Sequence, residues 1–260
     1  MTKRIFALML ALFMLCALAA CSGEDNVTDD PVINIGVQDL TYKDSNGDTF
    51  IYKPLTSTTV QIIGFSGSDE PHLVTIPAVI DEKDVVAIAD SAFKAKSNIS
   101  DIKCEAKLTT VGEYAFAYCE ALKTVELPST IEEIGKGAFY NCSAMVSCTL
   151  PEGLTTIHPI AFNNCFALPS ITFPSTLKTI GYYAFGNCTS LEAVIIPEGT
   201  AAVGEQAFYN CTSVAALSLP ASLEEIGDYA FNPFVRDLPD EAITVAEGSV
   251  AADYIKDFRP

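Results

Sequence analysis

Histidine and cysteine are the side chains of this sequence best suited to nucleophilic or metal chemistry. The chain carries two histidines and nine cysteines. A hydrolase or transferase needs a nucleophile, a base and an orienting group in one pocket. His158 and Cys165 form the only candidate pair, and burial would raise the pKa of that thiol and make it inert. His72 precedes the first predicted strand of the repeats, so we interpret both histidines as surface turn residues and predict no enzyme.

The cysteines predict a buried column rather than disulfides or a metal site. Cys16 and Cys21 lie at the start of the chain, Cys104 and Cys148 take aliphatic positions in predicted strands, and the other five recur every 23 residues: Cys119, Cys142, Cys165, Cys188 and Cys211. Stacked strands lie about 4.8 Å apart, which leaves the Cβ atoms slightly too far apart for a disulfide. A straight ladder of thiols also cannot surround a tetrahedral zinc ion.

No cofactor signature accompanies these residues. The sequence has no glycine-rich phosphate loop and no zinc-ligand spacing. The segment Asp44-Ser-Asn-Gly-Asp48 is acidic but lacks the remaining ligands of a calcium-binding EF-hand. We favour a hairpin turn there, and we predict neither a cofactor nor a metal.

A strict repeat organises most of the chain. Seven alanine-phenylalanine pairs recur at intervals of 23 residues, with the rings at Phe93, Phe116, Phe139, Phe162, Phe185, Phe208 and Phe231. A unit of this length cannot bury its apolar face alone, so successive units must stack in register. The spacing predicts a repeat solenoid with one continuous core.

Each unit contains a short strand that ends at a proline. In the unit from Leu122 to Cys142, apolar residues alternate from Val125 to Leu127, and Pro128 then removes a backbone donor. The same element recurs at Leu150-Pro151, Phe173-Pro174, Ile196-Pro197 and Leu219-Pro220. A glycine column, which needs a positive φ or a close backbone approach, marks a bend. The rest of each unit predicts a short irregular, helical or extended segment.

The unit L-x-x-I-x-L-P-x-x-L-x-x-I-G-x-x-A-F-x-x-C resembles the BspA-like leucine-rich repeat family. The match covers about Val74 to Phe231, with Lys96 and Phe234 replacing the cysteine in the first and last units. The resemblance implies a curved leucine-rich-repeat array with short parallel strands. It also implies a bacterial surface or secreted protein linked to adhesion.

The two ends of the chain differ from the repeats. Residues 1–20 form a basic-then-apolar leader, and Leu18-Ala19-Ala20-Cys21 resembles the bacterial lipobox, which implies acylation of Cys21. The alternative is an ordinary signal peptide with an incidental cysteine. Residues 21–31 predict an acidic tether, 32–73 a β-rich N-terminal cap, 74–234 the solenoid and 235–260 a short C-terminal cap.

Charge limits the classes of partner. The net charge is −18 at pH 7, which argues against nucleic acid and against adsorption to an anionic membrane. Membrane attachment would therefore depend on the acyl chains of Cys21. The oligomeric state is not indicated by the sequence.

Two surfaces are candidates for ligand binding. The first is an outward row on the predicted strands, spanning about 25 Å: Lys103, Glu126, Thr149, Thr172, Ile195 and Ser218. A milder second row runs beside it: Asp101, Thr124, Ser147, Ser170, Ala193 and Ala216. The alternative is that these residues are simply good strand formers. The second surface is a tyrosine stripe that binds ligand or shields the convex edge: Tyr114, Tyr140, Tyr183, Tyr209 and Tyr229.

These features lead to one hypothesis and one alternative. We predict a lipid-anchored protein of the bacterial envelope, on the outer membrane and facing the cell surface, that binds an extracellular protein or glycan in adhesion. The alternative is a periplasm-facing structural or accessory scaffold, for example one that assists glycan capture.

Overall fold

The computed structural model describes residues 39–259. They belong to one compact unit, Gln38–Pro260. The predicted leader of residues 1–20, Cys21 and the acidic tether of residues 21–31 lie outside the described residues.

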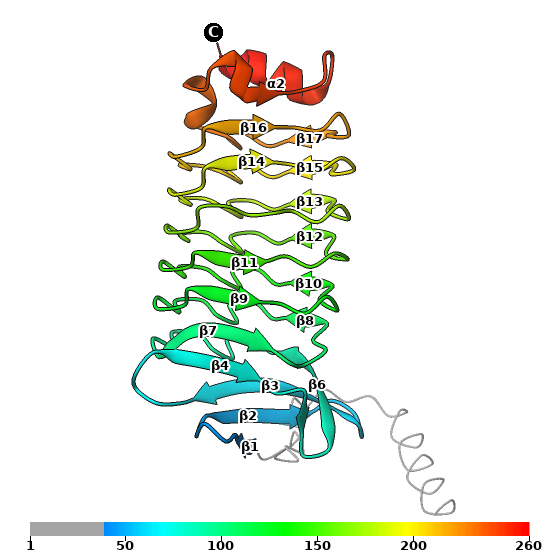
Figure 1. Cartoon of the computed structure of the whole chain (residues 1–260). Coiled ribbons are helices and arrows are strands. Elements are labelled where there is room, and N and C mark those ends of the chain that lie inside the picture. The colour runs from blue at the N-terminus through cyan, green and yellow to red at the C-terminus, as the bar shows by residue number, and fades with distance from the viewer. Residues whose placement is uncertain (1–38, 260) are drawn as a thin grey trace, which may run out of the picture. The chain divides into compact units, whose positions relative to one another are not determined.

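The repeats form a parallel solenoid, as the sequence predicts (Figure 1). One column of strands stands on the side of each coil that leads into the proline: β4 (His72–Ile76), β7 (Ile99–Cys104), β9 (Thr124–Glu126), β11 (Ser147–Thr149), β14 (Ala193–Ile195) and β16 (Ala216–Ser218). Neighbours pair in register 23 residues apart, as in Val125 with Cys148. In Figure 1 the coils stack with little curvature, less than the family resemblance implied.

A second column of two-residue strands closes each coil where the sequence left the structure open. Its members are β8 (Thr110–Val111), β10 (Glu133–Ile134), β12 (Thr156–Ile157), β13 (Thr179–Ile180), β15 (Ala202–Val203) and β17 (Glu225–Ile226). They continue without interruption into the N-terminal cap as an 11-stranded sheet. Because strands lie on both sides of the coil, neighbouring coils keep one spacing on both sides, which accounts for the straight stack.

The glycine column after these strands serves close backbone approach. A Cβ atom on Gly204 would lie 2.6 Å from the amide nitrogen of Tyr182, and one on Gly181 would lie 2.6 Å from that of Pro159. Neither glycine has a positive φ, so the positive-φ alternative is wrong for this column. The left-handed residues stand two positions later, for example at Tyr114 and Tyr183.

The phenylalanine column forms the centre of the core. All seven rings are fully buried, and neighbouring centroids lie between 4.9 and 5.6 Å apart. Interplanar angles reach only 18°, so each ring stacks on the next in an offset arrangement. The in-register packing predicted from the 23-residue spacing is confirmed.

The buried cysteine column satisfies backbone carbonyls. Each thiol donates to the carbonyl of the phenylalanine in the preceding coil, as Cys165 Sγ does to Phe139 O at 3.3 Å. The other four make the same contact at 3.0 to 3.3 Å. A small apolar side chain that can donate one weak hydrogen bond suits this position, which explains the recurrence of cysteine.

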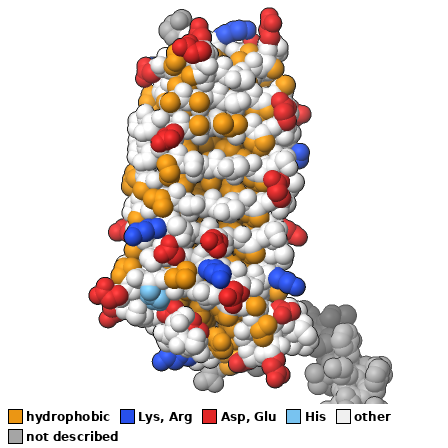
Figure 2. Space-filling model, in the orientation of Figure 1, with side chains coloured by type: hydrophobic (Ala, Val, Ile, Leu, Met, Phe, Trp, Pro, Cys, Tyr) orange, Lys and Arg blue, Asp and Glu red, His pale blue; other side chains and the backbone are white. Residues whose placement is uncertain are grey.

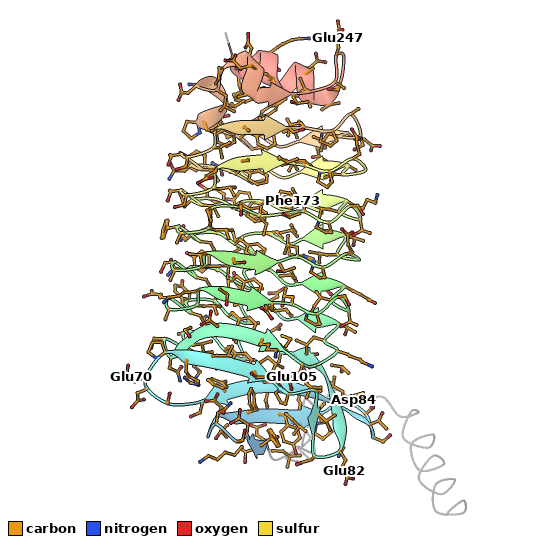
Figure 3. The ribbon with its side chains drawn as sticks, in the orientation of Figure 1. Glu70, Glu82, Asp84, Glu105, Phe173 and Glu247 are labelled. Carbon is orange, nitrogen blue, oxygen red and sulfur yellow. The ribbon has the colours of Figure 1, made fainter. Side chains whose placement is uncertain are left out.

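The first strand column is interrupted once. Residues 170–172 form no strand, which splits the column into a four-stranded sheet ending at β11 and a three-stranded sheet beginning at β14. Pro169 stands where Val146 and Ala215 each donate a backbone N–H to the preceding coil, and proline has no N–H to donate. Phe173, in the middle of the stack in Figure 3, packs against Phe185 at 5.5 Å, at the position that Leu150 and Ile196 fill in the neighbouring coils, and is buried as they are. The predicted strand at Phe173-Pro174 is therefore wrong.

Antiparallel strands cover the first coil. β1 (Leu40–Lys43), β2 (Thr49–Pro54) and β3 (Thr59–Ser66) form a meander, and β3 pairs in parallel with β6 (Lys83–Ile88). β5 (Val79–Ile80) makes a hairpin with β6. The rings of Phe50 and Phe65 lie 6.5 and 5.2 Å from Phe93, so this cap extends the phenylalanine column.

A helix covers the last coil. After two 3-10 turns, η1 (Phe234–Arg236) and η2 (Asp240–Ala242), strand β18 (Ile243–Thr244) pairs with β16 and leads into α2 (Val250–Phe258). Tyr254 of α2 packs edge to face on Phe231 at 5.8 Å. Among the described residues, no helix has the length and apolar character needed to cross a membrane.

Candidate binding surfaces

The predicted outward row lies on the exposed face of the first strand column. Lys103, Glu126 and Thr149 are paired neighbours on β7, β9 and β11, and Ile195 pairs with Ser218 across β14 and β16. Ser218 is half-buried and the other row members are exposed, whereas the inward residues beside them are buried. Thr172 is exposed too, but it lies in the interrupted coil, so the row stands on two sheets and not on one continuous surface.

The interruption leaves a shallow groove across this face. A depression of about 260 Å³ lies between residues 146–150 and residues 170–172. The second outward row runs along it through Ser147 and Ser170. At the N-terminal end of that row, the Thr124 hydroxyl donates to the carboxylate of Asp101. The face is therefore charged and internally hydrogen-bonded at one end, and neutral and grooved at the other.

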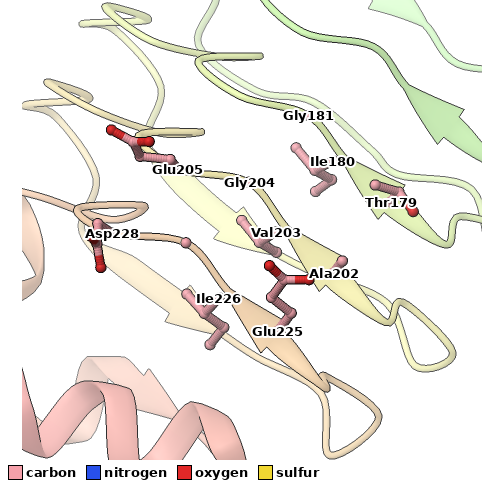
Figure 4. Close-up of a pocket in the computed structure, with 11 residues that line it drawn as sticks. Thr179, Ile180, Gly181, Ala202, Val203, Gly204, Glu205, Glu225, Ile226 and Asp228 are labelled. Atoms are coloured by element: carbon pink, nitrogen blue, oxygen red, sulfur yellow. The ribbon is translucent and has the colours of Figure 1, made fainter.

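The second strand column carries a depression that the sequence did not predict. It has a volume of about 510 Å³, and three glycines of this column, Gly181, Gly204 and Gly227, line it. Figure 4 labels the first two of them. Glu205, Glu225 and Asp228 rim it. The depression could not be predicted because its second strand column was not predicted. Strands of two residues leave almost no periodicity in the sequence.

The predicted tyrosines lie along the edge that carries the alanine-phenylalanine turns. We call this surface the tyrosine edge; it comprises the five predicted residues and two that the sequence reasoning missed: Tyr114, Tyr118, Tyr140, Tyr182, Tyr183, Tyr209 and Tyr229. The Tyr118 and Tyr140 rings meet at 5.2 Å, and Tyr183 and Tyr209 at 5.8 Å. Tyr118 and Tyr182 are 41% and 47% exposed, so both rings are accessible to solvent.

The cysteines are structural. All seven between Cys104 and Cys211 are free thiols, and burial raises the pKa of Cys119 and Cys211 to about 12. Cys165 is fully buried and its pKa is raised well above the ordinary value, chiefly by desolvation. His158 instead lies 3.4 Å from Glu133 through its Nε2 atom. His158 and Cys165 therefore do not form a nucleophile–base pair in this structure.

His72 differs from its predicted role. It is the first residue of β4, and its Nε2 atom lies 2.9 Å from Oδ1 of Asp48, which is only 1% exposed. Ser68 Oγ lies 3.1 Å from Nδ1 of the same ring. The cap thus assembles serine, histidine and aspartate, an arrangement that the repeat geometry did not predict.

The hydrogen bonds around His72 are those of an ion pair rather than of a catalytic base. Nδ1 lies 2.9 Å from the carbonyl oxygen of Glu70, which can only accept, so Nδ1 carries a proton. This bond and the Asp48 carboxylate raise the pKa of His72. With both ring nitrogens protonated, Nδ1 has no lone pair for the Ser68 proton, and Ser68 donates to Glu70 O instead. Figure 3 places Glu70 at the outer end of the loop before β4, which this ion pair fastens.

The acidic segment from Asp44 to Asp48 is the turn between β1 and β2. Asp44 Oδ1 accepts from the backbone amides of Asn46 and Asp48, both at 2.9 Å, so the carboxylate closes the turn on itself. Within residues 39–259 no group of three or more potential metal ligands is assembled.

A model of the "BspA type Leucine rich repeat region" matches residues 86–180 and 155–236 in six copies. The crystal structure of a leucine-rich repeat protein from T. pallidum is 23% identical, with a TM-score of 0.51 over 80% of this chain and 92% of that chain. A leucine-rich repeat protein from Eubacterium ventriosum is 20% identical, with a TM-score of 0.48 over 62% of this chain and 57% of that one.

A leucine rich cell surface protein from Faecalibacterium prausnitzii is 16% identical, with a TM-score of 0.35 over 85% of this chain and 98% of that chain. No curated protein sequence matches significantly. The structural likeness to the T. pallidum protein shows a shared fold. Because the family model spans more than half of the sequence, the chain belongs to the BspA-type leucine-rich repeat family.

Proposed function

We propose that the protein is a lipid-anchored, non-enzymatic scaffold displayed on the bacterial surface, where its outward strand row binds a protein or glycan of a host or neighbouring cell. One observation carries the proposal: the C-terminal half of the strand face is uncharged in a chain whose net charge is −18. Both outward rows contribute there, through Ser147, Thr149, Ser170, Thr172, Ala193, Ile195, Ala216 and Ser218.

The composition of this face fits a docking surface. Ile195, the last residue of β14, is 61% exposed, and its apolar side chain adds to the uncharged character of this face. In the upper part of Figure 2, Asp and Glu side chains lie mostly along the two margins of this face. Depletion of charge at the centre with a charged rim is the composition of protein interfaces.

Binding tests this assignment directly. The protein comprising residues 22–260 would be screened against matrix proteins and glycan arrays, and uniformly absent binding would contradict the proposal. Ile195→Lys would place a charge at the centre of the face and should weaken binding by about tenfold or more. Val79→Lys is the matched control, because Val79 is also an exposed β-strand residue, 47% accessible, but lies on the cap hairpin.

Acylation of Cys21 would provide the anchor, because the acidic surface gives no electrostatic attraction to anionic lipids. Cys21→Ala should abolish fatty-acid labelling and release the protein from membranes, and unchanged labelling would refute the anchor.

Protease treatment of intact cells distinguishes surface display from the periplasm-facing alternative. A displayed protein should be degraded while a periplasmic marker survives. If the protein showed hydrolase activity, and if His72→Ala and His158→Ala each abolished it, the protein would instead be an enzyme.

A further inference from the structure

The tyrosine edge concentrates one side-chain type beyond what packing needs. Seven of the ten tyrosines in the sequence stand on it, and the chain has no tryptophan. Five of them, all but Tyr209 and Tyr229, line a shallow groove of about 470 Å³ that runs over five consecutive coils. Asn163 and Gln206 contribute amides to the same groove. At the strand spacing of the solenoid, this groove is about 20 Å long.

The backbone beneath the groove carries strain that glycine would relieve. Tyr114, Ile160, Tyr183 and Gln206 occupy the same position of four coils, all with φ between 52° and 55°. A bulky residue in this left-handed region costs free energy that glycine does not. Glycine does occur in this column, at Gly137, so the fold accepts it. Because the fold accepts glycine at this position, the strain of the larger residues indicates that their side chains have a function.

The rings lie against the surface as platforms. A Cβ atom on Gly137 would be 2.5 Å from the Tyr114 ring, and one on Gly186 would be 2.2 Å from the Tyr183 ring. The Tyr114 ring therefore lies over a glycine of the following coil, and the Tyr183 ring lies over a glycine of its own turn. Desolvation raises the pKa of Tyr140 and Tyr183, so their phenols stay neutral and retain a proton to donate.

A buried amide opens into the same groove. Asn163 is 5% exposed, and its Nδ2 atom makes one long contact, 3.5 Å, to the carbonyl of Tyr183. Among the described hydrogen bonds none engages its Oδ1 atom, and Oδ1 is not among the fully buried unpaired atoms, so it keeps some access to solvent. Asn163 is one of the residues that line the groove. None of the residues that line the groove is charged at neutral pH.

This combination of groups favours a sugar polymer over other ligands. The face of a pyranose ring carries C–H groups that pack on the negative face of an aromatic ring, while its hydroxyls pair with phenols and amides. A polyanion would be repelled by the charge of −18. The coil spacing of about 4.8 Å is close to the length of one sugar unit in an extended chain, so successive units can meet successive coils.

We propose that the tyrosine edge binds a neutral polysaccharide laid along the solenoid axis. The inference rests on the proposed binding function, but it names the ligand class and assigns it to a surface other than the outward strand row. The aromatic platforms hold the sugar faces, and the Asn163 and Gln206 amides hold hydroxyls between them.

The test uses substitutions that the chain itself supplies. Tyr118→Asn copies Asn141, and Tyr183→Gln copies Gln206, each from the equivalent position of another coil with the same sign of φ. The double variant should therefore fold. Phe166→Thr, which copies Thr189, is the control, since Phe166 is an exposed aromatic, 41% accessible, outside the groove.

Affinity electrophoresis of residues 22–260, which include the whole compact unit, would use xyloglucan, mixed-linkage β-glucan, mannan and glycogen as neutral probes and polygalacturonate as the acidic probe. Tyrosine fluorescence gives a second readout without tryptophan background. We expect retardation by at least one neutral polysaccharide, a loss of about tenfold or more in affinity in the double variant, and no change in Phe166→Thr.

Each other outcome overturns the inference. Polysaccharide binding that survives the double variant but is lost in Ile195→Lys would move the ligand to the strand row and keep the proposed function. Binding of proline-rich peptides or matrix proteins alone would keep a scaffold but remove the glycan. Binding of no ligand at all would remove both proposals.

Discussion

The repeat coils and the N-terminal cap satisfy their buried groups in opposite ways. In the coils each contact has copies one coil away, such as thiol to carbonyl at the same separation in sequence five times over. In the cap each contact occurs once: Tyr52 with Asp81, His72 with Asp48, Asn98 with the Ser68 carbonyl. The coils thus distribute stability among neighbours, while the cap depends on individual polar pairs.

The largest effect should follow from breaking the phenylalanine column. Phe162 stacks between Phe139 and Phe185 at 5.2 and 5.1 Å, so Phe162→Ala removes two ring contacts and leaves a cavity. We expect the free energy of unfolding to fall by about 3 to 5 kcal/mol in urea denaturation. Phe166→Thr should change it by less than about 0.5 kcal/mol. A loss below about 1 kcal/mol in Phe162→Ala would contradict the shared core.

The cap should respond to its buried ion pair. Asp48→Asn removes the carboxylate that faces His72 and should destabilise the cap by about 1 to 3 kcal/mol, measured by amide hydrogen exchange in β1 to β3. The wild-type cap should also become less stable as pH rises. Because the folded-state pKa of His72 is raised, its contribution is complete below the ordinary value of 6.5 and is lost as pH rises through the higher folded value.

The Asp48→Asn variant is its own control for pH. The hydrogen bond from His72 to the Glu70 carbonyl, the largest cause of the raised pKa, remains in this variant, but the contribution of the Asp48 carboxylate is gone. Stability should therefore change less between pH 6 and pH 8.5 than in the wild type. Equal pH dependence in both proteins would show that the ion pair does not fasten the cap.

Removing one thiol of the buried cysteine column should reduce the free energy of unfolding by less. Cys165→Ala removes one weak hydrogen bond to Phe139 and a small volume, about 1 to 2 kcal/mol by urea denaturation. In the native protein this thiol should resist alkylation, because burial keeps its pKa raised. Half-buried Cys104 should react first. Rapid native labelling of Cys165 would contradict the closed column.

The smallest effect concerns the interrupted strand column. Pro169→Ala supplies the N–H that Val146 and Ala215 provide in their own coils. A new bond of about 1 kcal/mol is largely offset by the greater freedom of alanine in the unfolded chain, so stability should change by less than about 1 kcal/mol. The amide of residue 169 should nevertheless exchange slowly. Fast exchange would mean that Phe173, rather than Pro169, keeps the two sheets apart.

The 23-residue spacing was enough to predict the solenoid, the phenylalanine ladder and the buried thiols. Each of these depends on a residue type that recurs in the chain, and stacking converts recurrence in sequence into contact in space. The strand row was found by the same logic, since inward Val125 fixes outward Glu126. The apolar pattern before Pro174 predicts a strand in every coil, whereas the loss of the strand at residues 170–172 depends on the single N–H that Pro169 lacks.

Other features needed the tertiary structure. Asp48, Ser68 and His72 meet through the turn of one meander and the start of the next strand, and no period relates them. Tyr118 and Tyr182 join the other tyrosines only because left-handed residues turn their coils toward one edge. Repeated contacts follow from the sequence, because stacking brings residues of the same type together. A contact that occurs once depends on the conformations of the loops, and these are determined by the packing of the whole chain.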